Sequence, residues 1–98
     1  MFTIRRTEAF GRWLDGLKDR QAKARLIRRL ERAARGHLGD VRAVGAGVFE
    51  MREHFGPGWR MYYVRRGQTL IVMLCGGDKS SQSADIARAI ELAGLLED

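Results

Sequence analysis

Residues 74–81, LCGGDKSS, place a glycine pair, a lysine and two serines at the end of the apolar run LIVMLC. A helical pattern follows in SADIARAIELAGLL. Glycines allow a sharp backbone turn, Ser80 or Ser81 would cap the helix, and a helix N-terminus beside Lys79 favours an anion. The spacing does not match the G-x-x-x-x-G-K-[ST] nucleotide loop. Two interpretations remain, contact with a phosphate and a plain strand-to-helix turn with a solvated lysine.

Further basic side chains are expected on one face of a hairpin. The stretch GVFEMREHF alternates, with Glu50, Arg52 and His54 on one face. The turn GPG leads into WRMYYVRR, so Arg60 is expected on the same polar face as Arg52. An arginine offers paired donors to phosphate oxygens and stays charged. Alternatively, Arg60 supports the sheet through Glu50 or Glu53, and Arg52 forms a surface salt bridge, which is usually worth little.

Alternation along WRMYYVRR also divides its aromatic side chains between two faces. Trp59, Met61 and Tyr63 share one face and are expected in the core. Tyr62 shares the face of Arg60, where its ring would be able to stack on a nucleic-acid base.

The elements that must position these residues follow from the hydrophobic pattern. It predicts a strand, two helices, three or four strands and a last helix, an α+β order. Thr7 is the expected N-cap of the first helix and Gly36 the stop of the second. Short connections favour an antiparallel meander, and we expect the helices to pack on one face of the sheet. The expected ranges are 2–7, 8–17, 19–36, a short strand around 40–44, then 47–55, 59–66, 69–75 and 81–96.

Length and composition are those of one globular domain. The 98 residues are 45% hydrophobic and 31% charged, which suits a single domain spanning 1–98. No apolar run approaches the ~20 residues that span a bilayer, and the N-terminus lacks the apolar stretch of a signal peptide. The one cysteine, Cys75, lies in the most apolar segment, so we expect a buried thiol in a cytoplasmic protein.

The positive charge is concentrated in the first half of the chain. Residues 1–49 hold twelve Lys/Arg and five Asp/Glu, net +7, and residues 50–98 hold six and seven, net −1, which together give the total of +6. Most of the excess lies in KDRQAKARLIRRLERAAR, residues 18–35. Such a stripe indicates either a polyanionic partner or a solvated helix face. The expected surface arginines of this helix are Arg25, Arg28, Arg29, Arg32 and Arg35.

The segment GVFEMREHFGPGWRMYYVRRGQTLIVMLCGGDKSSQSADIARA resembles the RelE/ParE toxin superfamily. It is most similar to the HigB-like, phage Gp49-like branch of addiction module killer proteins. That branch carries a pattern of the kind G-V-x-E-L-R-x-x-x-G-P-G-[YW]-R-[VM]-Y-Y, then L-x-x-G-G-D-K-[ST]-x-Q-x-x-D-I-x-x-A. The likeness is close over residues 47–90, and the strand-helix-helix start fits the order of the superfamily.

The resemblance implies a RelE-like fold and a type II toxin–antitoxin role. It implies a cognate antitoxin, usually a helix-turn-helix repressor, and cleavage of messenger RNA on the translating ribosome with no metal or cofactor. The ParE branch instead poisons DNA gyrase, and fold alone does not choose between these activities. A prophage relic that only binds its antitoxin is a third possibility.

The resemblance also implies roles for single residues. Arg60 matches the arginine under the scissile phosphate, Arg52 a basic residue of the inner strand, and Lys79 a basic residue that contacts phosphate. Relatives place a tyrosine or histidine near the start of the last helix for proton transfer, where this chain offers Asp85. His54, whose ordinary pKa is near the useful range, is the other candidate. The arginines of the second helix would dock on ribosomal RNA.

Overall fold

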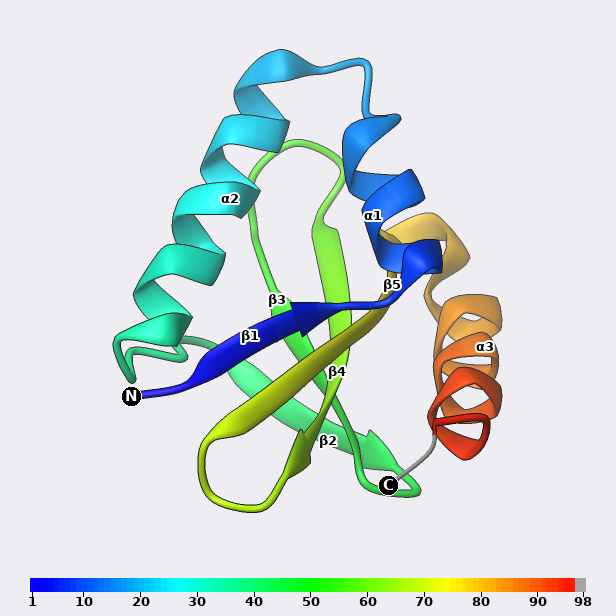
Figure 1. Ribbon diagram of the computed structural model, residues 1–98. Helices are drawn as coiled ribbons and strands as arrows, with labels where there is room; N and C mark the ends of the chain where they lie inside the picture. Colours follow the sequence, from blue (N-terminus) through cyan, green and yellow to red (C-terminus); the bar gives the residue numbers. More distant parts are fainter. Residues whose placement is uncertain (97–98) are drawn as a thin grey trace.

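The computed structural model describes residues 1–96 and confirms the predicted order of elements. No helix within these residues is long and apolar enough to cross a membrane. Helices α1 and α2 meet at an angle above the sheet, and α3 runs along the other side of the molecule (Figure 1). The elements are β1 (Thr3–Arg6), α1 (Glu8–Asp15), α2 (Arg20–Ala34), β2 (Val41–Gly45), β3 (Val48–Arg52), β4 (Trp59–Arg66), β5 (Leu70–Asp78), a 3₁₀ turn (Lys79–Ser81) and α3 (Gln82–Gly94).

The sheet has five strands in the order β1-β5-β4-β3-β2. Strands β2 to β5 form the predicted antiparallel meander. The expectation of a wholly antiparallel sheet is wrong at its edge, because β1 pairs with β5 in parallel. Short connections identify neighbouring strands only within the meander, whereas α1, α2 and strands β2 to β4 all lie in the sequence between β1 and its partner β5.

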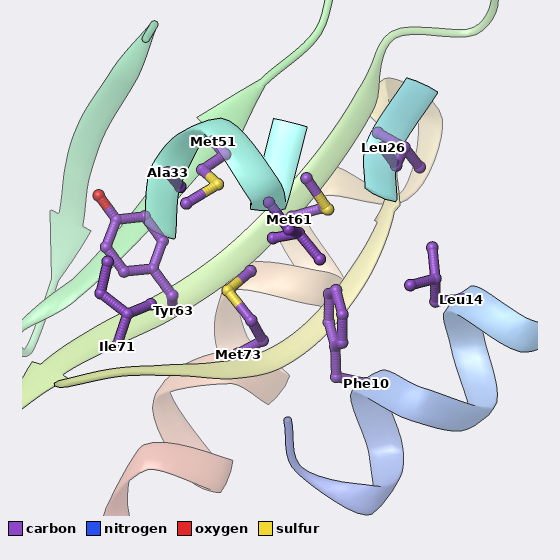
Figure 2. Packing of buried hydrophobic residues seen from close by; sticks show 10 residues of the cluster. Phe10, Leu14, Leu26, Ala33, Met51, Met61, Tyr63, Ile71 and Met73 are labelled. Carbon is purple, nitrogen blue, oxygen red and sulfur yellow. The ribbon is translucent and has the colours of Figure 1, made fainter. Parts of the chain in front are cut away.

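One face of the sheet is covered by α1 and α2. Phe10 and Leu14 of α1 point toward Met61 and Met73 of the sheet, and Leu26 of α2 lies above them (Figure 2). This face is apolar throughout its centre and forms the larger core. Its buried members are Phe10, Leu14, Leu26, Leu30, Ala33, Met51, Met61, Tyr63, Ile71 and Met73.

The opposite face is covered by α3, so the expectation that all helices pack on one face is wrong. The reason lies in the strands, whose second face is apolar as well over β4 and β5 and therefore also needs cover. A register shift after Tyr62 pairs that residue with Cys75 and the next one with Met73, so Leu74 and Cys75 both belong to this second core. Its buried members are Val48, Tyr62, Val64, Val72, Leu74, Cys75 and Ala89.

The predicted N-cap of α1 and the predicted glycine stop after α2 are confirmed, although α1 ends at Asp15 rather than at residue 17. The Thr7 hydroxyl accepts a hydrogen bond from the Phe10 amide at 3.1 Å and donates one to the Leu74 carbonyl at 2.8 Å. It therefore caps α1 and fastens the helix start to β5. Gly36 has a φ of 97°, a left-handed conformation that suits glycine after the end of a helix.

Candidate functional site

An open depression of about 220 Å³ lies where the β3–β4 loop meets the 3₁₀ turn before α3. Three of the residues singled out from the sequence, Arg60, Lys79 and His54, line it together. Arg52 and Asp85 do not. The complete lining is Glu53, His54, Gly56, Pro57, Gly58, Arg60 and Lys79.

Gly58 allows Arg60 and Lys79 to approach each other. Its φ of 80° is left-handed, and a Cβ at this position would lie 3.3 Å from the Lys79 Cβ and 3.5 Å from Nη1 of Arg60. The Lys79 amide also donates to the Pro57 carbonyl at 3.4 Å. Any larger residue would therefore be strained in its backbone and crowded by both cationic side chains.

Arg60 is held by backbone carbonyls rather than by a carboxylate. Its Nη1 donates to the carbonyls of Glu53 at 2.8 Å and Trp59 at 3.1 Å, and the side chain is almost fully buried. Within residues 1–96, neither Arg60 nor the exposed Lys79 forms an ion pair, and Nη2 of Arg60 makes no hydrogen bond. The one acidic residue of the lining, Glu53, is paired with Arg29, so the depression holds two cations that no carboxylate contacts, an arrangement that attracts an anion.

His54 lies in the loop after β3 rather than on the strand, because β3 ends at Arg52. Its Nε2 is 2.8 Å from Oδ2 of Asp40, and Nη2 of Arg52 is 3.3 Å from Oδ1 of the same carboxylate. The hydrogen bond with His54, followed by that with Arg52, holds the pKa of Asp40 below its ordinary value. Arg52 thus supports His54 indirectly through Asp40.

Sequence reasoning missed Asp40. The signal for it is the register of the β2–β3 hairpin, in which the Arg52 amide donates to the Asp40 carbonyl at 3.0 Å. The sequence predicted only a short strand near this position, and without the register the facing residues were unknown.

Ser81 stands at the N-cap position of α3, as expected, but its side chain makes no capping hydrogen bond. Asp78 takes this role for the 3₁₀ turn, since its carboxylate accepts from the Ser80 amide at 2.8 Å. These bonds with Ser80 lower the pKa of Asp78. Ser81 makes no cap bond, and its hydroxyl donates to the Asp85 carboxylate. An anion in the depression therefore depends on the side chains of Arg60 and Lys79 and not on the start of a helix.

Asp85 lies behind the site. Its carboxylate fills the space beside Gly77, where a Cβ would be 1.9 Å from Oδ2. Gly77 is the β5 partner of Arg60. This steric crowding explains why residue 77 is a glycine, because no side chain fits between β5 and Asp85.

Tyr62 lies on the same face as Arg60, as predicted, but it is fully buried beneath α3. The expectation that its ring would stack on a base is therefore wrong. Glu50, expected on an open polar face, is also fully buried. Burial, followed by the charge of Glu50, raises the pKa of Tyr62 far above its ordinary value, so its hydroxyl stays protonated.

The arginines of α2 divide into two groups. The expectation that Arg29 lies on the surface is wrong, because its side chain is buried. Its guanidinium forms an ion pair with the Glu53 carboxylate. It also donates hydrogen bonds to the backbone carbonyls of Leu38, Asp40 and Arg52. It ties the start of the β3–β4 loop, which lines the depression, to the connection between α2 and β2. The guanidinium of Arg25 lies 3.7 Å from the ring centre of Phe55. The other arginines expected on the surface are exposed, namely Arg25, Arg28, Arg32 and, at the C-cap, Arg35; Arg20 at the start of α2 is exposed as well.

The fold and this depression define a small α+β protein with a cationic depression at one end of its sheet. The family model described as phage-derived protein Gp49-like matches residues 12–94. An uncharacterized protein of Haemophilus influenzae is 42% identical over 93 residues, which cover 95% of this chain and 94% of that protein. The chain belongs to the Gp49-like family, a family of RelE/HigB-like toxins of toxin–antitoxin systems. Membership implies an antitoxin as partner.

Proposed function

We propose that this protein is a type II toxin that cleaves messenger RNA on the ribosome without a metal and is neutralised by a cognate helix-turn-helix antitoxin. The observation that supports this proposal best is the pairing of Arg60 and Lys79 around Gly58, with no carboxylate in ion-pair contact with either. A toxin that inhibits a protein target has no need for two such cations around one point. Cleavage of a phosphodiester does need them, because negative charge grows on the phosphate oxygens as the strand breaks.

In the proposed reaction the ribose 2′-oxygen attacks the adjacent phosphorus and the 5′-oxygen leaves. Arg60 is the residue beneath the phosphate. Its Nη1 is occupied by two carbonyls, which leaves Nη2 for a phosphoryl oxygen. Lys79 supplies a second positive charge from the other side of Gly58. Arg60 is fixed in advance by the fold, which is the condition under which charge stabilisation is most effective.

His54 is the proposed general base. If Asp40 accepts the Nε2 proton, Nδ1 of the ring is left to take the proton of the 2′-hydroxyl. Arg52 keeps Asp40 in place. Lys79 is the proposed proton donor for the leaving oxygen. Asp85, the other candidate, acts in this proposal by holding Ser81 and packing on Gly77.

The exposed arginines of α2 are the proposed contact with ribosomal RNA. Arg25, Arg28, Arg32 and Arg35 project from one helix, and Arg25 stacks on the loop that lines the depression. Docking through this helix would therefore place RNA beside the site. Electrostatic docking of this kind weakens steeply with salt.

The test is 5′-end mapping of a defined messenger RNA in a reconstituted translation reaction. Wild type and Arg60→Ala are each compared with and without ribosomes. New ends that depend on ribosomes and disappear in Arg60→Ala are the expected result. A wild-type protein that arrests growth but makes no cuts would contradict the proposal and point to a protein target such as gyrase. A protein that neither cuts nor arrests growth would be an inactive relic.

A further inference from the structure

A carboxylate is buried beneath the start of α3. The Glu50 side chain is fully buried; Oε1 accepts a hydrogen bond from Nε of Arg42 at 3.1 Å and Oε2 accepts one from Nε2 of Gln82 at 2.8 Å. Tyr62 is its partner across β3 and β4, and the buried Tyr62 hydroxyl has no hydrogen-bond partner within residues 1–96. No other carboxylate of the described residues is as completely buried.

Burial of this charge is unfavourable by itself. A carboxylate that leaves water loses strong solvation, and an apolar side chain of similar size would pack against α3 without that loss. The compensating guanidinium of Arg42 is half exposed, which weakens its attraction. The stability of the second core therefore does not explain Glu50, and the hydrogen bond to Gln82 is the contact that leads toward the depression.

Gln82 is the first residue of α3 and directly follows the 3₁₀ turn that carries Lys79. Within residues 1–96, two hydrogen bonds join residues 79–82 to segments that are not their neighbours in the chain: the long one from the Lys79 amide to Pro57 at 3.4 Å, and the shorter one from Gln82 to Glu50 at 2.8 Å. The bonds of Ser80 and Ser81 with Asp78, and of Ser81 with Asp85, tie the turn only to the adjoining ends of β5 and α3. Since Ser81 gives α3 no side-chain cap, Gln82 is the main polar anchor of this helix start.

We propose that Glu50 is a positioning residue for the anion site: through Gln82 it fixes the 3₁₀ turn so that Lys79 stands beside Arg60 across Gly58. The proposal rests on the proposed function only for the nature of the anion, an RNA phosphate. It also accounts for the placement of a charged residue on β3 between two core positions, Phe49 and Met51.

The first experiment follows the turn itself and needs no activity. Hydrogen exchange of the amides in residues 79–86 is measured for wild type, Gln82→Ala and the matched control Gln21→Ala, which removes an exposed glutamine from α2. Gln82→Ala should exchange at least about tenfold faster in this segment, with β4 unchanged, because the loss of its anchor opens the turn locally. Equal exchange in all three proteins would overturn the proposal.

The second experiment asks whether Gln82 acts through Lys79. The ligand is a short RNA with 2′-deoxy substitutions, which cannot be cleaved, and its affinity is measured at several salt concentrations. Gln82→Ala and Lys79→Ala should each weaken binding, up to about tenfold, and each should lower the salt slope by about 0.7. The double variant should be no weaker than Lys79→Ala alone, because one contact is lost in all three. Additive losses would contradict the proposed route.

A residue exchange separates the hydrogen bond from simple burial. Gln82→Glu sets two carboxylates against each other and should loosen the turn, whereas Gln82→Glu combined with Glu50→Gln restores one amide–carboxylate bond in reverse. Recovery of slow exchange in the double variant supports the proposal, and no recovery in a folded double variant contradicts it. If wild type binds the RNA but cuts no messenger on ribosomes, the proposed function fails while the exchange results still decide the role of Glu50.

Discussion

The two faces of the sheet are built from alternate residues of the same strands, yet they differ in kind. Toward α1 and α2, the strands present Met51, Met61 and Tyr63, which pack in a continuous apolar core. Toward α3, the immediate neighbours are Glu50, Arg60 and Tyr62, of which the first two are charged and the third has an unpartnered hydroxyl. Strand alternation thus separates packing from chemistry within each strand.

The comparison teaches where a small domain can place a cationic site. The α1–α2 face, called the closed face below, is packed with apolar side chains over its centre, whereas the cover over the other face ends at the start of α3, next to Lys79. A charged group needs partners or solvent, and that end of the sheet offers both backbone carbonyls and an opening. Stability and the proposed activity should therefore respond to different substitutions.

The largest effect is expected from a cavity on the closed face. Leu14→Ala removes a fully buried side chain that packs in the α1–α2 core, and it should lower the free energy of unfolding by about 2–5 kcal/mol. Denaturant titration measures the loss. Leu95→Ala, at an exposed leucine, should change the free energy by no more than about 0.5 kcal/mol. Equal losses in both variants would mean that the closed face is not the main core.

The reverse pattern is expected for Lys79→Ala. Removal of a charge that faces the scissile phosphate should lower messenger cleavage by about 10²–10³. The free energy of unfolding should change by less than about 0.5 kcal/mol, because the side chain is exposed and supports no core. Lys18→Ala removes a similar exposed charge from the connection between α1 and α2 and serves as the control. A variant that cleaves at the wild-type rate would remove Lys79 from the site.

The sequence predicted the closed face better than the other one. Alternation correctly placed Met61 and Tyr63 inside and put Tyr62 on the face of Arg60, and the glycine turn GPG correctly brought Arg60 back toward the strand end. It did not reveal that α3 covers Tyr62, because the pattern of one strand does not say which helix lies over it. Packing across the sheet is decided by contacts between distant segments.

The polar contacts were the least predictable. Helical spacing does place Arg29 on the buried stripe of α2, three residues after Leu26 and four before Ala33, but its partner Glu53 follows only from the position of α2 against the β3–β4 loop. Asp40 similarly gains its role from the hairpin register that sets it beside His54. Side-chain pairs of this kind form where two elements of the fold meet, so the sequence pattern of one segment does not predict them.

The third prediction concerns how completely α3 covers its face of the sheet. Burial, followed by the charge of Asp85, raises the pKa of Cys75 from 9.0 to about 11. At pH 8 its thiolate should be about 100-fold scarcer than in the unfolded chain, and alkylation slower by at least that factor. Because the protonated thiol is the form favoured in the fold, this group's contribution to stability should fall as pH rises from about 9 to 11.

Timed alkylation with and without denaturant measures this factor. A folded protein that reacts as fast as the denatured chain would show that α3 leaves the sheet readily. In that case the sheet face under α3 would not be a covered region, and it would no longer differ from the open end beside Lys79.

The smallest effects are expected on the outer surface of α2, and they concern binding rather than folding. Arg28→Ala and Arg32→Ala each remove one exposed charge, so each should lower the salt slope of ribosome binding by about 0.7–0.9 and leave the unfolding free energy nearly unchanged. The slope is measured by co-sedimentation with ribosomes from about 50 to about 200 mM salt, the range in which such contacts weaken.

Arg29→Ala is the contrasting variant, because it breaks a buried ion pair and should lower the free energy of unfolding by about 3–5 kcal/mol. A slope that stays the same when both exposed arginines are removed would show that α2 does not meet the ribosome, and its charge would then be a solvated helix face.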